Sequence, residues 1–432
     1  MLEQTIQTLA SMISRQPVFP VILIIELPLY ALIIAGVVRY RLSRCPPGRG
    51  ARDHRPRVSC IITCYSEGEA VGNTIHSLLD QTYPGAIEIL AVVDGAAANR
   101  QTWQTLQALK SAFAGKRRRV LKILPKWQRG GRVSSMNAGL QLSRGEIVMV
   151  LDGDTSFDND MVAEVVERMA DPAMLALTGT LRVRNRRASL WTRFQALEYL
   201  VGLIATRTGL SAFNLINNVS GAFGVFRRDI VTRMGGWECG TAEDLDMTMR
   251  LKRYGRRRRD RRIGFEPRAI GHTDAPVSFA DLLRQRLRWD GDLFYVYVRK
   301  HRGAFAPGIL GWPNLIATLW YGLLHQIVLP FVIVIYLVWI LLTRPAAEVL
   351  AGLLLVYGLY ALIATVMTLL AIGLLSERRS DDLQLVVLLP LFPVYRGVMR
   401  LWSSVAILAE VILETHKDSS MAPWWILQRS RY

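Results

Sequence analysis

Cysteine is scarce in this chain: the 432 residues include only four, Cys45, Cys60, Cys64 and Cys239. They lack the paired spacing that the ligands of a structural zinc site have along a sequence. A cytoplasmic domain also keeps its thiols reduced, which argues against disulfides in the location predicted below. We therefore expect core or incidental thiols at these positions.

Negative charge is also in short supply, because 35 acidic residues stand against 53 lysines and arginines, for a net charge of +18. Such an excess suits either nucleic acid or an anionic membrane surface. The chain has no recognised nucleic-acid-binding motif, so we expect no nucleic-acid partner. Membrane lipids explain the charge without one, since each basic residue near an anionic leaflet contributes about 1 kcal/mol of binding free energy.

Apolar sequence, by contrast, is abundant: hydrophobic residues make up 51% of the chain and the mean hydropathy is +0.22. It gathers near the two ends, in runs long enough to cross a bilayer at about 18–38, 319–342 and 349–375. A fourth run, about 384–412, is weaker because prolines and charged residues interrupt it. We predict three parts: an N-terminal transmembrane anchor (1–44), a globular domain (45–300) and a C-terminal transmembrane region (301–432).

The distribution of arginine predicts how these parts are oriented. Only Arg15 precedes the first run, whereas seven arginines follow it within residues 39–57. Cytoplasmic flanks of membrane spans carry this excess, so the globular domain should face the cytoplasm. Two segments of that domain, near 189–216 and 278–300, combine apolar residues at helical spacing with charged ones. We expect both to be amphipathic helices at the membrane interface.

The globular domain alternates strand-like and helical patterns. Apolar, β-branched runs at 58–65, 87–94, 119–125 and 147–151 are each bounded by turn signals, and helical periodicity separates them. Strands that alternate with helices of this length form a mostly parallel sheet, so the fold class is α/β and doubly wound.

Acidic residues stand where these predicted strands end. Asp94 closes the second strand, Asp152 and Asp154 close the fourth, and Glu67 follows the first. One Asp-Gly-Asp could be an ordinary turn, but several carboxylates at strand carboxyl ends favour a ligand site, because open α/β sheets bind ligands at that edge. The sequence therefore predicts a polar site there.

An ordered set of motifs resembles one enzyme family. IITCYSEGE, VVDGAA, GGRVSSMNAGL, LDGDT, NNVSGAFGVFRRD, TAEDLDMTMRLKRYG and QRLRW follow one another between residues 61 and 289. Together with the flanking spans they resemble the membrane-embedded processive family 2 glycosyltransferases, which include cellulose, chitin, hyaluronan and poly-N-acetylglucosamine synthases. The resemblance implies a GT-A fold (a Rossmann-like nucleotide-diphospho-sugar transferase domain) inserted between transmembrane helices. It also implies a bacterial inner (cytoplasmic) membrane protein, multi-pass, with its catalytic domain in the cytoplasm.

The resemblance implies roles for the donor side of the site. Asp154, with Asp152, would hold Mg²⁺ or Mn²⁺, hard cations that prefer carboxylate oxygens and stabilise a departing diphosphate. Asp152 would also contact the donor. Uridine would meet Glu67 and Asp94, and Arg132, which replaces the family's lysine, would meet phosphate or base. The implied donor-binding set is Tyr65, Glu67, Asp94, Arg132, Asp152 and Arg288.

The remaining motifs imply the catalytic and acceptor residues. Asp244, the second acid of Glu-Asp, would take the proton from the acceptor hydroxyl, and Glu243 beside it is the other catalytic candidate. Acids at a helix start are also favourable to the helix dipole, which leaves a purely structural role open for Glu243. Gln285, Arg288 and Trp289 share one helix face, where Trp289 would offer a flat surface to a sugar ring. The alternative is an amphipathic helix with a tryptophan at the membrane interface.

Two functions remain open at this point. The first is an inverting, metal-dependent, processive enzyme that polymerises a β-linked polysaccharide from UDP-N-acetylglucosamine or UDP-glucose and moves it across the membrane. The second is a non-processive glycosyltransferase that adds one sugar to a lipid-linked acceptor. The expected partners are the UDP-sugar, the growing polysaccharide or glycolipid acceptor, membrane lipids and, as an open possibility, accessory export subunits. For a polymer channel, the candidate lining residues are Glu26, Trp320, Tyr336, Arg396, Arg400 and Trp402, which could instead simply pair with one another.

Overall fold

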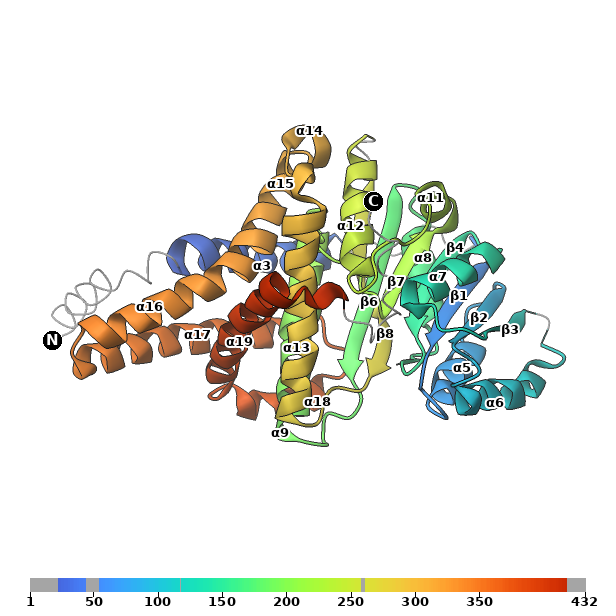
Figure 1. The fold of residues 1–432 in the computed structure, drawn as a ribbon, viewed down its shortest axis with the longest axis horizontal. Coiled ribbons are helices and arrows are strands. Elements are labelled where there is room, and N and C mark those ends of the chain that lie inside the picture. Colours follow the sequence, from blue (N-terminus) through green and yellow to red (C-terminus); the bar gives the residue numbers. More distant parts are fainter. Residues whose placement is uncertain (1–21, 44–53, 117, 258–260, 418–432) are drawn as a thin grey trace.

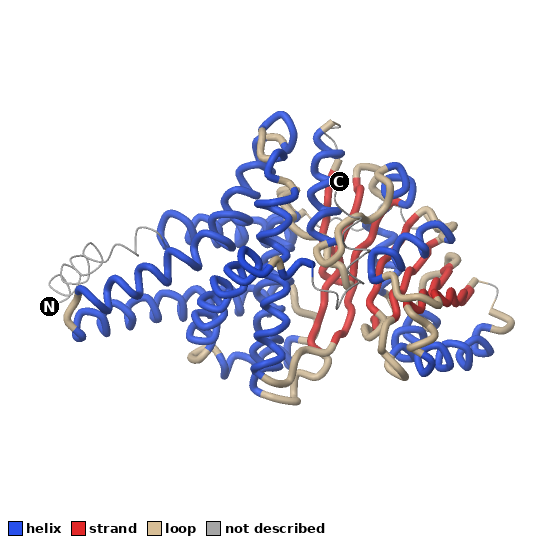
Figure 2. Tube along the Cα trace, in the orientation of Figure 1, coloured by secondary structure: helices blue, strands red, loops and turns tan. Residues whose placement is uncertain are grey.

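The computed structural model describes residues 22–43, 54–116, 118–257 and 261–417. A sheet with its covering helices forms one half of the molecule, and an arm of long helices projects from it (Figure 1). The strands gather in the sheet half, whereas the described part of the arm is helical (Figure 2). The predicted division into a globular α/β part and apolar helices is therefore visible directly in the architecture.

Eight strands form one sheet in the order β3-β2-β1-β4-β7-β6-β8-β5. The strands β1 to β4 are parallel to one another, β7 is antiparallel to both of its neighbours, and β6 and β8 are parallel. This arrangement confirms the predicted mostly parallel α/β sheet. The strands are β1 (Val58–Cys64), β2 (Ile87–Asp94), β3 (Arg119–Lys126), β4 (Ile147–Asp152), β5 (Ser156–Phe157), β6 (Met174–Val183), β7 (Phe223–Arg227) and β8 (Arg262–Thr273).

Helices cover both faces of the parallel strands, which explains why those strands are apolar without alternation. In β1, Cys60 and Ile62 belong to the core on one face, and Ile61 belongs to the core on the other. Cys60, Cys64 and Cys239 are buried free thiols, as expected, while Cys45 lies outside the described residues. The covering helices are α5 (Val71–Leu79), α6 (Arg100–Leu109) with η2 (Lys110–Phe113), α7 (Gly131–Leu142), α8 (Met161–Met169), α11 (Arg228–Arg233) and α12 (Glu243–Arg256).

Two further helical segments connect the sheet to the arm. The first runs from α9 (Leu190–Glu198) through the π-helical η3 (Tyr199–Ala205) into α10 (Thr206–Ser211). The second runs from α13 (Phe279–Phe294) into the π-helical η4 (Tyr295–Lys300). They coincide with the two segments predicted near 189–216 and 278–300, and their membrane-interface position stays a prediction. Short elements follow: η5 (Arg302–Ala304), α14 (Pro307–Leu310) and, near the end of the described chain, η8 (Thr415–Lys417).

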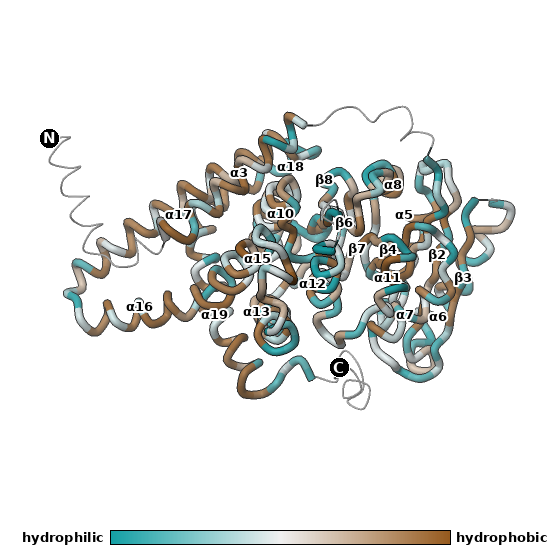
Figure 3. The backbone as a smooth tube through the Cα atoms, turned by 90° about the horizontal axis from the view of Figure 1, so that it is seen from above, coloured by the Kyte–Doolittle hydropathy of each residue, from teal (hydrophilic) through white to brown (hydrophobic). Residues whose placement is uncertain are grey.

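In the part of the chain that the structure describes, two helices of the arm are long and apolar enough to cross a membrane. They are Trp312–Thr343, built from α15 (Trp312–Ala317), η6 (Thr318–Val328) and α16 (Leu329–Thr343), and α17 (Ala346–Leu374). Figure 3 shows α16 and α17 as largely hydrophobic along their lengths. A third span is possible by length and composition if α18 (Arg379–Leu383) with η7 (Gln384–Leu388) and α19 (Phe392–Leu413) count as one.

That third candidate covers the weak span predicted over about 384–412, which prolines and charged residues interrupt. Its two parts meet at an angle of 77°, and the bend falls at Pro390, just before α19 begins. Proline lacks the N–H that a continuous helix needs, which explains the break. The predicted first span, 18–38, is helical from Ile22 through η1 (Ile22–Glu26) and α3 (Leu27–Leu42), and residues 18–21 lie outside the described chain.

The first helix packs against the sheet domain through glycine. A Cβ atom at Gly36 of α3 would lie 2.1 Å from the backbone oxygen of Gly209 in α10. A Cβ at Gly209 would lie 2.5 Å from the backbone oxygen of Ile33. Small residues allow helix backbones to approach this closely. Any side chain at either glycine would therefore push α3 away from α10.

Candidate functional site

The carboxyl ends of β1, β2 and β4 meet beside a cavity of about 240 Å³, which we call the donor pocket. A larger cavity of about 500 Å³, here the acceptor cleft, adjoins it and shares Arg132, Asp152, Asp154 and Arg288 with it. Every residue predicted for the site lines one or both cavities. The donor pocket is lined by Tyr65, Glu67, Asp94, Arg132, Asp152, Asp154 and Arg288, and the acceptor cleft adds Glu243, Asp244, Gln285 and Trp289. The structure thus brings together segments that are up to 224 residues apart in the sequence, from Tyr65 to Trp289.

Asp94 is fixed by the protein itself. Its carboxylate accepts a hydrogen bond from the Lys126 Nζ atom at 2.6 Å and from the backbone N–H groups of Gly130 and Gly131, both at 2.8 Å. The two N–H groups belong to the start of α7, where helix N–H groups have no partner within the helix. Asp94 therefore joins the ends of β2 and β3 to α7 and shapes the wall of the donor pocket, a task that the sequence did not indicate.

Glu67 lies against the Asp-Gly-Asp segment, residues 152–154. One of its carboxylate oxygens, Oε2, is buried and has no hydrogen-bond partner within the described part of the chain. A Cβ at Gly153 would lie 3.1 Å from the Glu67 side chain, so glycine is needed there for Glu67 to approach. Burial, together with the charges of Asp154 and Asp152, raises the pKa of Glu67 above its ordinary value.

Asp152 and Asp154 extend from the end of β4 into both cavities. Burial by the surrounding walls and the neighbouring Asp152 charge raise the pKa of Asp154. In the described residues no group of three His, Cys, Asp or Glu side chains could close around a metal ion. Two carboxylates beside an orphaned Glu67 oxygen do fit a cation that keeps waters and takes its other ligands from a donor diphosphate.

Arg132 ties the two acidic motifs together. Its guanidinium lies 2.6 Å from Asp152 Oδ1 and donates to Glu243 Oε1, also at 2.6 Å. It donates further to the backbone oxygen of Gly221 at 2.7 Å. These partners raise the pKa of Arg132 despite its burial. The predicted contact with phosphate or base stays a prediction, since the structure shows this side chain engaged by protein carboxylates.

Glu243 and Asp244 begin helix α12 and differ in their surroundings. Glu243 is only 4% exposed, and burial with the charge of Asp244 raises its pKa to about 7 even though Arg132 opposes that shift. Asp244 opens into the acceptor cleft. Its Oδ2 atom accepts from the Asn218 side-chain amide at 3.1 Å and from the Gly221 N–H at 3.3 Å. Asn218, in the loop before β7, orients the candidate base. The motif that contains Asn218 did not by itself predict this role.

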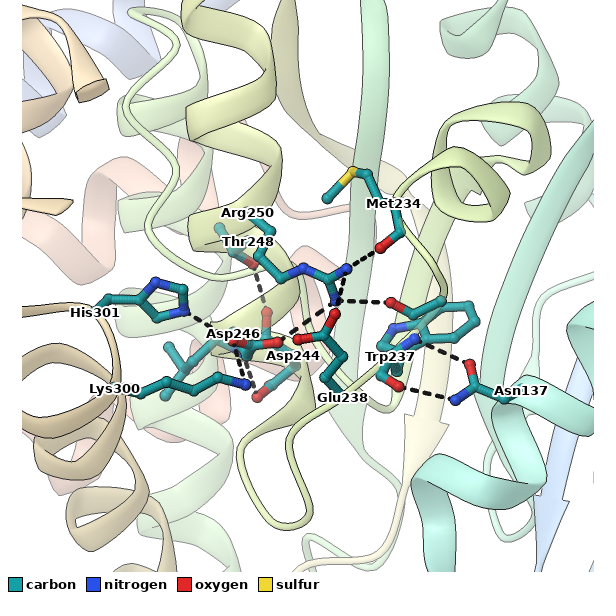
Figure 4. A network of polar contacts seen from close by, with 12 residues as sticks. Asn137, Met234, Trp237, Glu238, Asp244, Asp246, Thr248, Arg250, Lys300 and His301 are labelled. Atoms are coloured by element: carbon teal, nitrogen blue, oxygen red, sulfur yellow. Dashed lines mark hydrogen bonds and ion pairs between the residues drawn. The ribbon is translucent and has the colours of Figure 1, made fainter. Parts of the chain in front are cut away.

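A buried polar network anchors the first turn of α12 to the helix that carries the acceptor motif (Figure 4). Asp246 is fully buried, and its carboxylate lies 2.8 Å from both Lys300 Nζ and His301 Nε2. Its pKa is lowered, because hydrogen bonds and the charges of these partners outweigh burial. Thr248 donates to the backbone oxygen of Asp244 one turn away. The first turn of α12, which carries Asp244, is therefore held from both sides.

The helix α13 presents the acceptor motif to the cleft. Trp289 is 37% exposed, and the Arg286 guanidinium stacks 4.8 Å from its ring centre. Gln285 and Arg288 line the same cleft. Arg286 itself is paired with Glu198 at 2.6 Å, which keeps the tryptophan platform attached to α9. The ring therefore stays open to the cleft on a fixed support.

The residues that flank Glu-Asp and Arg-Trp meet in space. Thr241 lies just before the start of α12, and Asp292 follows Arg-Trp on α13. The hydroxyl of Thr241 donates to Asp292 Oδ1 at 2.6 Å. Burial raises the pKa of Asp292 to about 8, with smaller contributions from Asp244 and Glu243. Thr241 and Asp292 thus form one contact between the start of α12 and α13.

A third cavity, of about 320 Å³, lies among the arm helices, and we call it the membrane cavity. It shares Gly202, Thr206 and Tyr321 with the acceptor cleft. Of the predicted channel residues, Tyr336, Arg396 and Arg400 line it. The others have structural partners: Glu26 is fully buried and pairs with Arg400, while Trp320 and Trp402 donate to the backbone oxygens of Ile25 and Leu283.

The chain is similar to proteins whose names describe sugar transfer. It is 28% identical over 234 residues to a poly-β-1,6-N-acetyl-D-glucosamine synthase of Staphylococcus epidermidis, covering 54% of this chain and 53% of that protein. The same enzyme of Staphylococcus aureus strain COL is 27% identical over 256 residues, 58% of each chain. The chain thus spans about half the length of the curated relatives it matches.

A solved structure shows the same fold. The mannosyltransferase PcManGT from Pyrobaculum calidifontis, in complex with GDP-Man and Mn²⁺, aligns with a TM-score of 0.55 at 20% identity. The alignment covers 89% of this chain and 99% of that one, which confirms the predicted GT-A fold. The model of the family described as glycosyltransferase like family 2 matches residues 56–291, more than half of the chain. This protein therefore belongs to the family 2 glycosyltransferases.

Proposed function

We propose that this glycosyltransferase polymerises a β-linked polysaccharide from UDP-N-acetylglucosamine or UDP-glucose and passes the product into the membrane. One observation carries the proposal: the acceptor cleft holds Asp244 and Trp289 and shares Gly202, Thr206 and Tyr321 with the membrane cavity. A growing chain could leave the site along that connection without dissociating. The synthase names of the relatives support the same product class.

In the donor pocket, the nucleotide-sugar would lie along the carboxyl ends of β1, β2 and β4, with Tyr65, Glu67 and Asp94 in the wall around the base. Asp152 and Asp154 are the residues that would hold Mg²⁺ or Mn²⁺. When bound, such a cation stabilises the negative charge of the departing diphosphate as a Lewis acid. Arg288 lines both cavities, and in this proposal it would donate to the same phosphates.

Asp244 takes the proton from the acceptor hydroxyl in this proposal. Its carboxylate lies in the cleft, oriented by Asn218 and the Gly221 N–H. Glu243 is less suited, because it is buried and bound to Arg132. A single base opposite the leaving group implies one displacement with inversion at the anomeric carbon. An α-linked donor would therefore give a β-linked product.

The membrane cavity suits a glycan in part. Five tyrosines line it, and aromatic rings offer flat faces to sugar rings. Arg396 and Arg400 add hydrogen-bond donors, and both are paired, with Glu198 and Glu26. The catalytic domain would then face the cytoplasm of a bacterial inner membrane, with the product leaving on the other side. Accessory export subunits would act there. The tyrosines are Tyr30, Tyr321, Tyr336, Tyr357 and Tyr360.

A second candidate function rests on the other residues of that cavity. Much of its wall is aliphatic, with Ile33, Leu329 and Leu353 among the lining side chains. A wall of this kind also suits the hydrocarbon tail of a lipid-linked acceptor. In that case the enzyme would add a single sugar to the lipid and release it.

The test is an assay of the purified full-length protein in lipid vesicles against UDP-N-acetylglucosamine, UDP-glucose and other UDP-sugars. Long products that a β-specific hydrolase digests only after the vesicles are opened would support the proposal, because such products lie on the side of the membrane opposite the donor. Trp289→Ala should then shorten the products or abolish them, because the acceptor loses its stacking surface. Single-sugar products that stay on the donor side of the membrane would instead establish the lipid acceptor.

A further inference from the structure

Arg207, on α10, lines the acceptor cleft and differs from the other buried arginines around it. Arg132 pairs with Asp152 and Glu243, and Arg286 pairs with Glu198. Within the residues that the structure describes, the Arg207 guanidinium has no hydrogen bond and no ion pair. Arg207 is half-buried, and its nitrogens are not among the fully buried atoms that lack a partner, so its N–H donors stay available to a ligand in the cleft.

The electrostatic surroundings point the same way. Carboxylate partners raise the pKa of Arg132 and of Arg286. Burial lowers the pKa of Arg207, and the charges of Tyr321, Asp244 and Tyr199 only partly offset that effect. The guanidinium is thus short of negative or hydrogen-bond-accepting atoms in the protein alone. A ligand that supplied oxygen atoms would relieve that shortage.

The position of Arg207 indicates which ligand this is. Arg207 is absent from the wall of the donor pocket, where Asp152, Asp154 and Arg288 would meet the diphosphate. Its neighbour Thr206 lines both the acceptor cleft and the membrane cavity. An acceptor that reaches Asp244 from the membrane cavity would pass this point. The Arg207 guanidinium therefore lies beside the path of the acceptor and outside the donor pocket.

We propose that Arg207 forms an acceptor subsite at the junction of the acceptor cleft and the membrane cavity, where it donates hydrogen bonds to the oxygens of a glycan. The atoms that suit it are the hydroxyl and acetamido carbonyl oxygens of the sugar next to the reacting one. A guanidinium carries five N–H donors in a fixed plane, so it can engage two such oxygens at once. The inference rests on the proposed function, because it assigns the binding of that function's acceptor.

The experiment compares wild type, Arg207→Gln and Arg207→Lys in full-length protein in vesicles, with a β-linked N-acetylglucosamine tetrasaccharide as the acceptor probe. Loss of hydrogen bonds from a charged donor should raise the acceptor KM by about 10- to 100-fold in Arg207→Gln. Arg207→Lys should lie between that variant and wild type, since it keeps the charge but not the planar donors. Donor KM and the slow hydrolysis of the donor by water should stay within about twofold of wild type, because neither uses the acceptor. Arg193→Gln is the matched control, since Arg193 is exposed on α9 of the same helical segment.

Three results would overturn the subsite. One is an unchanged acceptor KM in Arg207→Gln. Another is a rise in donor KM as large as the rise in acceptor KM, which would place Arg207 in donor binding or in the general fold, and UDP binding with thermal unfolding would separate those two. The third is a larger effect with a lipid phosphate acceptor than with the tetrasaccharide. If wild type itself fails to extend the tetrasaccharide or any other glycan, the proposed function fails. If wild type extends it and Arg207→Gln does so equally well, only the subsite fails.

Discussion

The two sides of the catalytic cleft are built on different physical foundations. On the donor side, polar groups extend from the ends of parallel strands and neutralise one another, as Arg132 does with Asp152 and Glu243. On the acceptor side, helices that pack by apolar contacts form the wall, and Arg207 has no partner among the described residues. A donor pocket in which Arg132 is already paired and Glu67 keeps an unsatisfied carboxylate oxygen is suited to a divalent cation and the diphosphate it binds. An acceptor cleft in which the Arg207 guanidinium has no partner among the described residues is suited to a ligand that moves past it.

This comparison leads to experiments that act on one side at a time. Changes at the donor side should remove turnover outright, since charge stabilisation there is part of the chemistry. Changes at the acceptor side should weaken binding or alter stability while the donor still binds. The expected loss of turnover is therefore larger for donor-side changes than for acceptor-side changes.

The largest effect is expected for Asp154→Asn. Asp154 lies at the end of β4 beside Asp152, and the amide would remove the charge that a divalent cation needs. Loss of a Lewis acid worth several kcal/mol corresponds to a fall in kcat of about 1,000-fold or more. The measurement is transfer rate at increasing Mn²⁺, with donor binding followed by calorimetry. Full wild-type activity in excess chelator would show that no metal acts at these residues.

Asp244→Asn should cost slightly less and should separate chemistry from binding. The base contributes about 10²- to 10⁴-fold, so kcat should fall within that range. The amide can keep the contacts with Asn218 and Gly221, because its oxygen still accepts hydrogen bonds. UDP affinity, measured directly, should stay within about twofold of wild type. If UDP affinity fell as much as kcat, Asp244 would be a donor-binding or structural residue and not the base.

The donor side was largely predictable from the sequence, and the acceptor side was not. Apolar runs that end in acids indicate strands and the edge they share, so local patterns alone place Asp94, Asp152 and Asp154 at one edge of the sheet. The partners of those residues depend on segments far apart in the chain. The pairing of Arg132 with Glu243 joins residues 111 positions apart, and that of Thr241 with Asp292 joins residues 51 apart. No local pattern contains this information.

Local patterns were less informative for the arm. The run over 384–412 was predicted as a weak span that prolines and charges interrupt, and the helices on the two sides of Pro390 meet at 77°. Arg207 was visible only as a charge that interrupted an apolar segment. Its significance depends on what surrounds it after folding, which is a property of packing between α3, α10 and the arm. A side chain whose role depends on having no protein partner cannot be identified from the sequence pattern around it.

Gly209→Ala tests the packing that positions Arg207. The new methyl group would lie 2.5 Å from the backbone oxygen of Ile33, so α3 must move away from α10. Overpacking of this kind costs about 1–3 kcal/mol of unfolding free energy. We expect a lower midpoint of thermal unfolding and a raised acceptor KM, with donor KM unchanged. Gly358→Ala, on α17, is the matched control, because a Cβ at Gly358 meets no atom within 4 Å. Equal effects of the two substitutions would contradict the steric explanation.

The smallest effect on turnover is expected for Asp292→Asn, whose main consequence is a change of stability that depends on pH. Burial raises the pKa of Asp292 from its ordinary value of 3.8 to about 8, with Asp244 and Glu243 adding to the shift and Arg288 and the Thr241 hydroxyl opposing it. Between about pH 4 and pH 8 the folded protein therefore holds a proton that the unfolded chain has released. The free energy of unfolding must fall as the pH rises through this interval.

Asparagine at position 292 keeps an acceptor for the Thr241 hydroxyl and has no proton to lose. The variant should thus unfold at a higher temperature than wild type at about pH 8, and the difference should vanish near pH 4. Asp229→Asn, at an exposed acid on α11, serves as the control and should show no such trend. A difference between Asp292→Asn and wild type that stays constant across the interval would mean that this carboxyl is already ionised in the folded protein. The acceptor side would then carry the same kind of balanced charge as the donor side.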